Sequence, residues 1–123
     1  MILVDTSVWI GHFRASDSIL VGLLEQGQVL THPFVIGELA LGNLRTRGPI
    51  LEALNQMPNV VRAHDEEVLA FVESQRLHGL GIGYVDVHLL VSAKLTPGTK
   101  LWTLDQRLAA IAAKQGMGFT SRA

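Results

Sequence analysis

Ile2-Leu3-Val4-Asp5-Thr6-Ser7 opens the 123-residue chain with a short apolar run that ends on an acid. Such a run, bounded by polar residues, is typical of a buried β-strand. A short helix is expected next, over residues 7–13. The same order returns near the other end, where Leu101-Trp102-Thr103-Leu104 precedes Asp105 and a helical segment. We therefore expect two buried strands that each lead into a carboxylate.

Gly and Pro divide the chain between these two strands into short segments of alternating type. Strands are expected at residues 2–4, 28–31, 59–62 and 100–104, with a short fifth one at 118–120. Helices are expected at residues 7–13, 17–25, 33–44, 49–57, 65–78, 84–95 and 105–115. Such alternation is typical of a parallel sheet covered by helices on both faces. The sequence therefore predicts one α/β domain over residues 1–123, a three-layer sandwich with a central parallel sheet of four to five strands.

Composition and charge narrow the classes of function. Hydrophobic residues make up 48% of the chain and charged residues only 17%, and there is no cysteine, which excludes disulfides and thiolate chemistry. The chain has neither a basic segment before its first apolar run nor an apolar stretch near the ~20 residues of a membrane span. We therefore expect a soluble cytoplasmic protein. The net charge of −1 does not by itself indicate a nucleic-acid binder.

Four of the eleven acidic residues stand in apolar surroundings. The other seven suit helix starts, helix ends or polar helix faces: Asp17, Glu25, Glu52, Asp65, Glu66, Glu67 and Glu73. Asp5 and Asp105 follow apolar strands, and each could also simply cap the helix after it. Glu38 and Asp86 have apolar neighbours at helical spacing.

A buried carboxylate without a positive partner costs several kcal/mol or takes up a proton. No apolar segment supplies a Lys or Arg beside each of these four acids. Mg²⁺ and Mn²⁺ prefer carboxylate and water oxygens, so a divalent cation is a fitting partner. In open α/β sheets, sites gather at the carboxyl ends of the strands. We therefore expect Asp5, Glu38, Asp86 and Asp105 to form one metal site that hydrolyses a nucleic-acid phosphodiester.

Four motifs, taken in order, resemble a known family. They are Asp5-Thr6-Ser7, Glu38-Leu39 with Gly42, Gly-Tyr-Val-Asp-Val-His-Leu-Leu at 83–90, and Leu-Trp-Thr-Leu-Asp-Gln-Arg-Leu at 101–108. Together they span the chain and resemble the PIN-domain ribonucleases, and among these the VapC-like toxins of bacterial toxin–antitoxin modules.

The resemblance implies a PIN-like fold in which Asp5, Glu38, Asp86 and Asp105 form the acidic quartet. It also implies Mg²⁺ or Mn²⁺ as the cofactor, cleavage of RNA, a homodimer, and inhibition by a VapB-like antitoxin. Thr6 and Thr103 would support the site through hydrogen bonds. Many PIN domains carry a further acid shortly after the last of the four, whereas Gln106 and Arg107 stand there in this chain. This departure favours one firmly held metal ion over two.

Arg45 and Arg47 follow the expected Glu38 helix and are the best candidates for contacts with RNA phosphates. His88 is expected to be a core or surface histidine rather than a catalytic one. Two other functions stay open from the residues: a non-catalytic PIN scaffold that binds RNA or an antitoxin, and an aspartyl phosphatase or phosphoacceptor domain. The second would use Asp5 as nucleophile and would need an acid where Ser7 stands.

Overall fold

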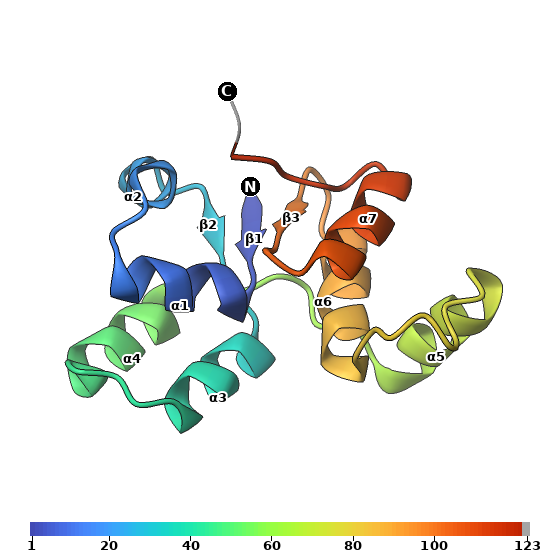
Figure 1. The fold of residues 1–123 in the computed structure, drawn as a ribbon, viewed down its shortest axis with the longest axis horizontal. Helices are drawn as coiled ribbons and strands as arrows, with labels where there is room; N and C mark the ends of the chain where they lie inside the picture. The colour runs from blue at the N-terminus through green and yellow to red at the C-terminus, as the bar shows by residue number, and fades with distance from the viewer. Residues whose placement is uncertain (122–123) are drawn as a thin grey trace.

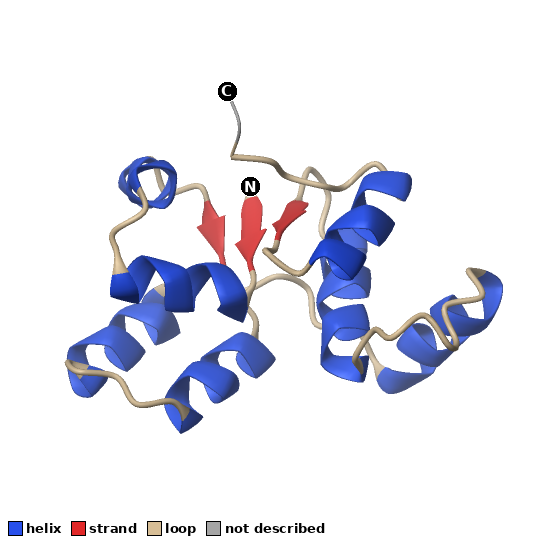
Figure 2. Ribbon diagram, in the orientation of Figure 1, coloured by secondary structure: helices blue, strands red, loops and turns tan. Residues whose placement is uncertain are grey.

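The computed structural model describes residues 1–121 and contains a short parallel sheet with helices on both sides (Figures 1 and 2). The strands are β1 (Ile2–Val4), β2 (Val29–Leu30) and β3 (Lys100–Trp102). The helices are α1 (Thr6–Arg14), α2 (Ser18–Glu25), α3 (Pro33–Leu41), α4 (Arg47–Gln56), α5 (Asp65–Ser74), α6 (Tyr84–Leu95) and α7 (Gln106–Lys114).

The first strand is the centre of the sheet. The strand order is β2-β1-β3, and β1 runs parallel to both neighbours. Ile2 pairs with Val29 on one side and with Lys100 on the other. All three residues of β1 are buried, as a strand between two neighbours requires. The predicted α/β class and parallel sheet are confirmed, and the carboxyl ends of the strands share one edge.

The predicted count of four to five strands was wrong, because the described residues form three. At residues 59–62 the pairing is limited to one parallel bridge between Thr31 and Asn59. Beyond this bridge, backbone amides bond hydroxyl groups at the C-terminal end of α6: Val61 N–H donates to Thr96 Oγ1 and Ala63 N–H to Ser92 Oγ. At the other edge, the segment predicted as residues 118–120 also forms one bridge, between Leu101 and Gly118. Side-chain acceptors thus replace the sheet ladder at one edge.

The helices form two groups around this sheet. In Figure 1, α1 to α4 lie on the side of β2 and α5 to α7 on the side of β3. Helix α6 has the predicted bounds and is the most buried helix, with every residue from Val87 to Ala93 inside. Helix α3 ends at Leu41 and α5 at Ser74, each a few residues earlier than predicted. No helix within residues 1–121 is long and apolar enough to cross a membrane.

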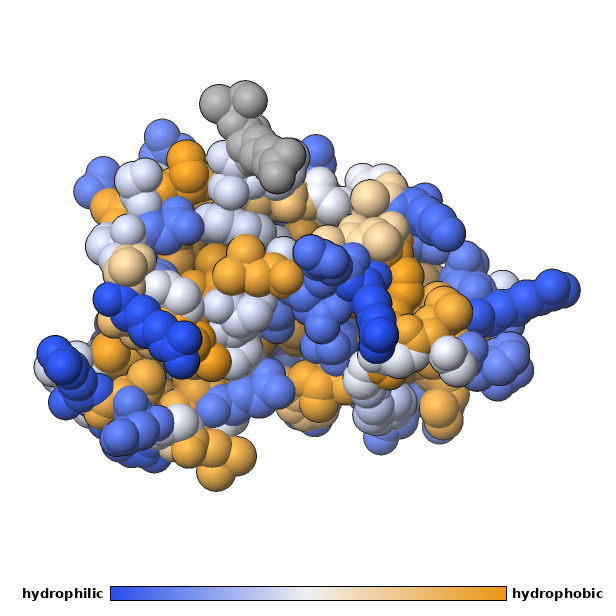
Figure 3. All heavy atoms as spheres, in the orientation of Figure 1, coloured by the Kyte–Doolittle hydropathy of each residue, from blue (hydrophilic) through white to orange (hydrophobic). Residues whose placement is uncertain are grey.

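Apolar and polar side chains alternate over the face seen in Figure 3, without one continuous apolar band. The most exposed large apolar residue is Leu41, at 91%. It lies at the end of α3.

Candidate active site

Asp5 occupies the carboxyl end of the central strand and is buried, with 6% of its surface exposed. Its Oδ2 accepts hydrogen bonds from Ser7 Oγ and from Thr103 Oγ1, both at 2.7 Å. Asp5 stands at the N-cap position of α1, but its side chain makes no capping hydrogen bond there. Helix capping therefore does not explain why a carboxylate stands at this buried position.

The two hydroxyls that hold Asp5 are themselves held by the turn after β3. Leu104 N–H donates to Ser7 Oγ at 3.0 Å, and Asp105 N–H donates to Thr103 Oγ1 at 3.1 Å. Each hydroxyl thus accepts from a backbone amide and donates to the same carboxylate oxygen. Ser7 was missed in the sequence, although its position two residues after an acid is typical of a side chain that bonds locally.

Glu38 comes from α3, and its Oε1 accepts a 2.6 Å hydrogen bond from Thr6 Oγ1. It is exposed, contrary to the expectation that it lies among apolar neighbours. Helix α3 buries Val35 and Leu39, while Leu41 faces solvent with Glu38. Nearly every position of this helix is apolar, so spacing alone did not identify the buried face.

Asp105 follows β3 and is exposed. Its Oδ1 accepts a 3.0 Å hydrogen bond from Leu108 N–H, so it caps α7. Capping uses one carboxylate oxygen of Asp105 and is compatible with binding of a metal ion by the other. Asp86 lies in the first turn of α6 and is partly buried.

Electrostatics shows that the four acids share one region. The pKa of Asp86 is raised to about 6, first by burial and then by the negative charges of Asp5, Asp105 and Glu38, in that order. Like charges raise a carboxyl pKa only when they lie nearby. Among the described residues, none of the charges that shift this pKa is positive. The region is therefore a concentration of uncompensated negative charge.

The fit of these residues to a metal ion has two sides. Oxygen ligands with a combined negative charge suit Mg²⁺ or Mn²⁺. Within residues 1–121, however, no three carboxylate or imidazole side chains lie close enough together to hold an ion as they stand. Mg²⁺ keeps several water ligands and is usually bound through only one or two carboxylates. The residues therefore fit a divalent cation by charge and ligand type, with wider spacing than direct ligation by three side chains requires.

A groove of about 960 Å³ lies beside Glu38, between α1 and the segment that follows α3. Arg14 and Arg45 line it together with Ile10 and Phe13. Arg47 is not part of its lining; its guanidinium donates to the backbone oxygen of Ala40 and ties the start of α4 to α3. Cationic side chains thus stand along one approach to the acidic region.

Comparison with known proteins agrees with this arrangement. The family model described as PIN domain matches residues 2–114. The chain belongs to the PIN-domain family. It is 47% identical over 117 residues to the protein called Ribonuclease VapC32 of Mycobacterium tuberculosis, in strain CDC 1551 / Oshkosh and equally in strain H37Rv. The match covers 95% of this chain and 94% of each relative, so this PIN domain is VapC-like over its whole length.

This PIN domain departs from many others after Asp105, and the structure gives the departing residue a local contact. Arg107 Nη1 donates a long hydrogen bond of 3.4 Å to Gly81 O. Gly81 has a φ of +78° and belongs to the loop before α6. Arg107 therefore links the helix that follows Asp105 to the loop that leads to Asp86.

Proposed function

We propose that this PIN domain is a Mg²⁺- or Mn²⁺-dependent endoribonuclease that acts as the toxin of a toxin–antitoxin module. The main support is the 47% identity over 95% of the chain to proteins called ribonucleases. The gathering of Asp5, Glu38 and Asp105 around Asp86 adds physical support, because their charges raise the pKa of Asp86.

The four carboxylates would hold the cation, and each is presented differently. Asp5 keeps Oδ2 for Ser7 and Thr103, so Oδ1 is the oxygen left for the ion. Thr6 orients Glu38. When bound, the cation would lower the pKa of a water molecule and neutralise charge on the phosphate. Asp86 or Asp105 would accept the proton of the attacking water.

RNA would approach over the groove beside Glu38, where Arg14 and Arg45 would contact phosphates. Arg47 has a smaller part in this proposal, because its guanidinium already bonds Ala40 O. The proposal includes a VapB-like antitoxin, a homodimer and a cytoplasmic location, and the similarity to proteins called VapC32 supports the antitoxin. Exposed apolar side chains such as Leu41 and Ile10 would be covered in those assemblies.

The test is cleavage of RNA by the purified protein with Mg²⁺ or Mn²⁺, compared with Asp5→Asn. This change removes the charge but leaves an oxygen for the two hydroxyls. Because loss of a group that merely supports a metal ligand costs about 10–100-fold in metal affinity or activity, loss of the ligand charge itself should lower cleavage by at least about tenfold. Asp17→Asn is the matched control, because Asp17 is not one of the four site acids, caps α2, and Asn caps equally well.

Three results would redirect the assignment. Undiminished cleavage by Asp5→Asn would show that the site is misplaced. Tight binding of RNA or antitoxin by the parent without any cleavage would favour the non-catalytic scaffold. Trapping of Asp5 by beryllofluoride would favour the aspartyl phosphatase, which membership of the PIN-domain family does not support.

A further inference from the structure

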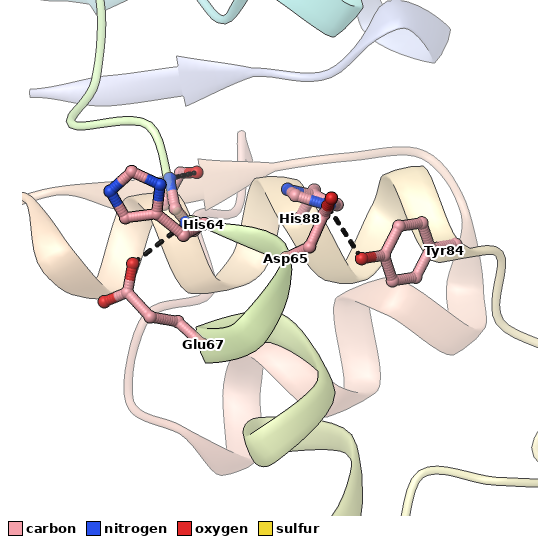
Figure 4. A network of polar contacts seen from close by, with 7 residues as sticks. His64, Asp65, Glu67, Tyr84 and His88 are labelled. Atoms are coloured by element: carbon pink, nitrogen blue, oxygen red, sulfur yellow. Dashed lines mark hydrogen bonds and ion pairs between the residues drawn. The ribbon is translucent and has the colours of Figure 1, made fainter.

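Outside the acidic region, one exposed carboxylate joins two helices. Asp65, the first residue of α5, bonds two side chains of α6 through the same oxygen (Figure 4). Tyr84 Oη donates to Asp65 Oδ1 at 2.8 Å, and His88 Nε2–H donates to it at 2.9 Å. His88 must be the donor, because an ionised carboxylate only accepts. Tyr84 and His88 are four residues apart, so they lie on one side of the first turns of α6.

The anchor on α5 is itself fixed. His64 N–H donates to Glu67 Oε1 at 2.9 Å, which secures the first turn of α5 (Figure 4). Asp65 therefore projects from a capped helix start. Its side chain is 75% exposed, whereas the side chain of His88 is 2% exposed.

The N-terminus of α6 has no side-chain cap at its N-cap residue. That residue is Gly83, which has no side chain to cap the helix. The loop before it contains Gly79 and Gly81, both with positive φ. The backbone of Gly83 lowers the pKa of Asp86, the third residue of the helix, so this carboxylate lies beside the uncapped start of α6.

Helix geometry links the contact of Asp65 to the position of Asp86. Asp86 is two residues from Tyr84 and two from His88, which is about 200° around the helix axis. Asp65 therefore holds one side of the first turn, and Asp86 stands on the opposite side. Rotation or fraying of this turn would break the bonds to Asp65 and displace the Asp86 carboxylate in the same movement.

We propose that Asp65 is a positioning residue for the metal site, because its bonds to Tyr84 and His88 fix the first turn of α6 and thereby place Asp86. The proposal rests on the proposed metal-dependent function. Asp65 touches neither the ion nor the substrate, and acts through Asp86.

The experiment measures Mn²⁺ binding by calorimetry and amide hydrogen exchange of the metal-free protein. Asp65→Ala removes the acceptor, and Asp65→Asn restores an oxygen that can accept both bonds. Glu66→Ala is the matched control: Glu66 is the next residue, is exposed, and carries the same charge. Tyr84→Phe removes one of the two bonds and serves if Asp65→Ala does not fold.

We expect Asp65→Ala to bind Mn²⁺ about tenfold more weakly, the lower end of the loss typical of groups that orient metal ligands. Exchange at the Val87 amide, which donates to Gly83 O, should become faster. Glu66→Ala should change neither quantity by more than about twofold, and Asp65→Asn should recover most of the affinity. Tyr84→Phe should lie between the parent and Asp65→Ala.

Parent-like Mn²⁺ binding by Asp65→Ala overturns the proposal, as does an equal loss in Glu66→Ala, since that would mean a general effect of charge. Unchanged exchange at Val87 overturns it too. If the parent protein binds no Mn²⁺, the proposed function itself fails and takes the positioning role with it. The parent measurement therefore separates the two failures.

Discussion

Replacing Thr103 with Val tests how the acidic site is held together. Val keeps the shape of Thr and removes the hydroxyl. Two hydrogen bonds are lost: the 2.7 Å bond to Asp5 Oδ2 and the 3.1 Å bond from Asp105 N–H. The first matters more, because Asp5 is 6% exposed and cannot be reached freely by water. Asp105 is exposed, so water can take over its amide.

The magnitude follows from these surroundings. A hydrogen bond to a charged group contributes about 1.5–3 kcal/mol, and a neutral one about 1 kcal/mol. Thr103→Val should therefore lower the free energy of unfolding by about 3 kcal/mol, measured by urea denaturation in EDTA. Thr46→Val is the control, because Thr46 is exposed and its side chain makes no capping bond. Its effect should stay within about 0.5 kcal/mol.

Ser7 gives the reasoning a second test, because its hydroxyl donates to the same oxygen of Asp5. Removing both donors leaves a buried carboxylate oxygen without a partner. Ser7→Ala combined with Thr103→Val should therefore cost at least ~0.5 kcal/mol more than the sum of the single changes. A purely additive pair, or a Thr103→Val protein as stable as Thr46→Val, would refute the shared role of the two hydroxyls.

Three further predictions concern pH, the loop before α6 and Asp105. The pKa of buried His32 is lowered to about 4 by burial and by nearby His88 and Arg62. As pH falls, the unfolded chain therefore takes up a proton on this residue before the folded chain does. The free energy of unfolding should decrease as pH falls from about 6.5 to 4. This decrease should be about 3 kcal/mol, and the His32→Gln protein should not show it when denatured across the same pH range. Gly81→Ala should lower the free energy of unfolding by at least ~1 kcal/mol, because φ is +78° and the new Cβ would meet the Arg107 guanidinium; thermal denaturation measures this loss. Asp105→Ala should lose about 1 kcal/mol of capping energy relative to Asp105→Asn in urea denaturation, while both lose RNA cleavage.

Each of these has its own control. Metal-free Asp86 opposes His32, because its raised pKa of about 6 makes the folded chain take up the proton first. The pH effect must therefore be measured as a difference between the parent and His32→Gln, and parallel profiles would contradict it. Gly79→Ala has the same backbone strain in open space, and an equal cost would remove any role for Arg107. Equal stability of the two Asp105 variants would exclude capping.

Local patterns predicted those parts of the fold whose partners are close in sequence. Helix α6 was predicted with its observed bounds, since Gly83 precedes it and Pro97 follows its end. The parallel sheet followed from the alternation of segments. Residues 59–62 were predicted as a strand because of Val60 and Val61, but the amides of Val61 and Ala63 bond Thr96 and Ser92, which lie more than 25 residues away. A local sequence pattern cannot indicate that distant side chains compete with a neighbouring strand for these amides.

The candidate site shows the same division. Asp5 and Asp105 were placed by the ends of their strands, and the chain was correctly assigned to its family from four motifs. Ser7 was missed although Asp5 is only two residues away, because the amide of Leu104, which holds its hydroxyl in place, lies 97 positions away. Asp65 was interpreted as an ordinary helix-start acid, which it is, but its bonds to α6 depend on how two helices pack.

The hydrogen bond from Thr103 to Asp5 spans 98 positions. During synthesis the central strand is made before β3 and before the turn that holds Asp5. A chain that stops before Lys100 lacks one neighbour of β1 and the donor from Thr103 to the carboxylate. Closing so long a loop is costly and slow compared with local folding. Translation products that stop before Lys100 should therefore be inert, and the chemistry of the site should become available only after β3 and Thr103 have been made.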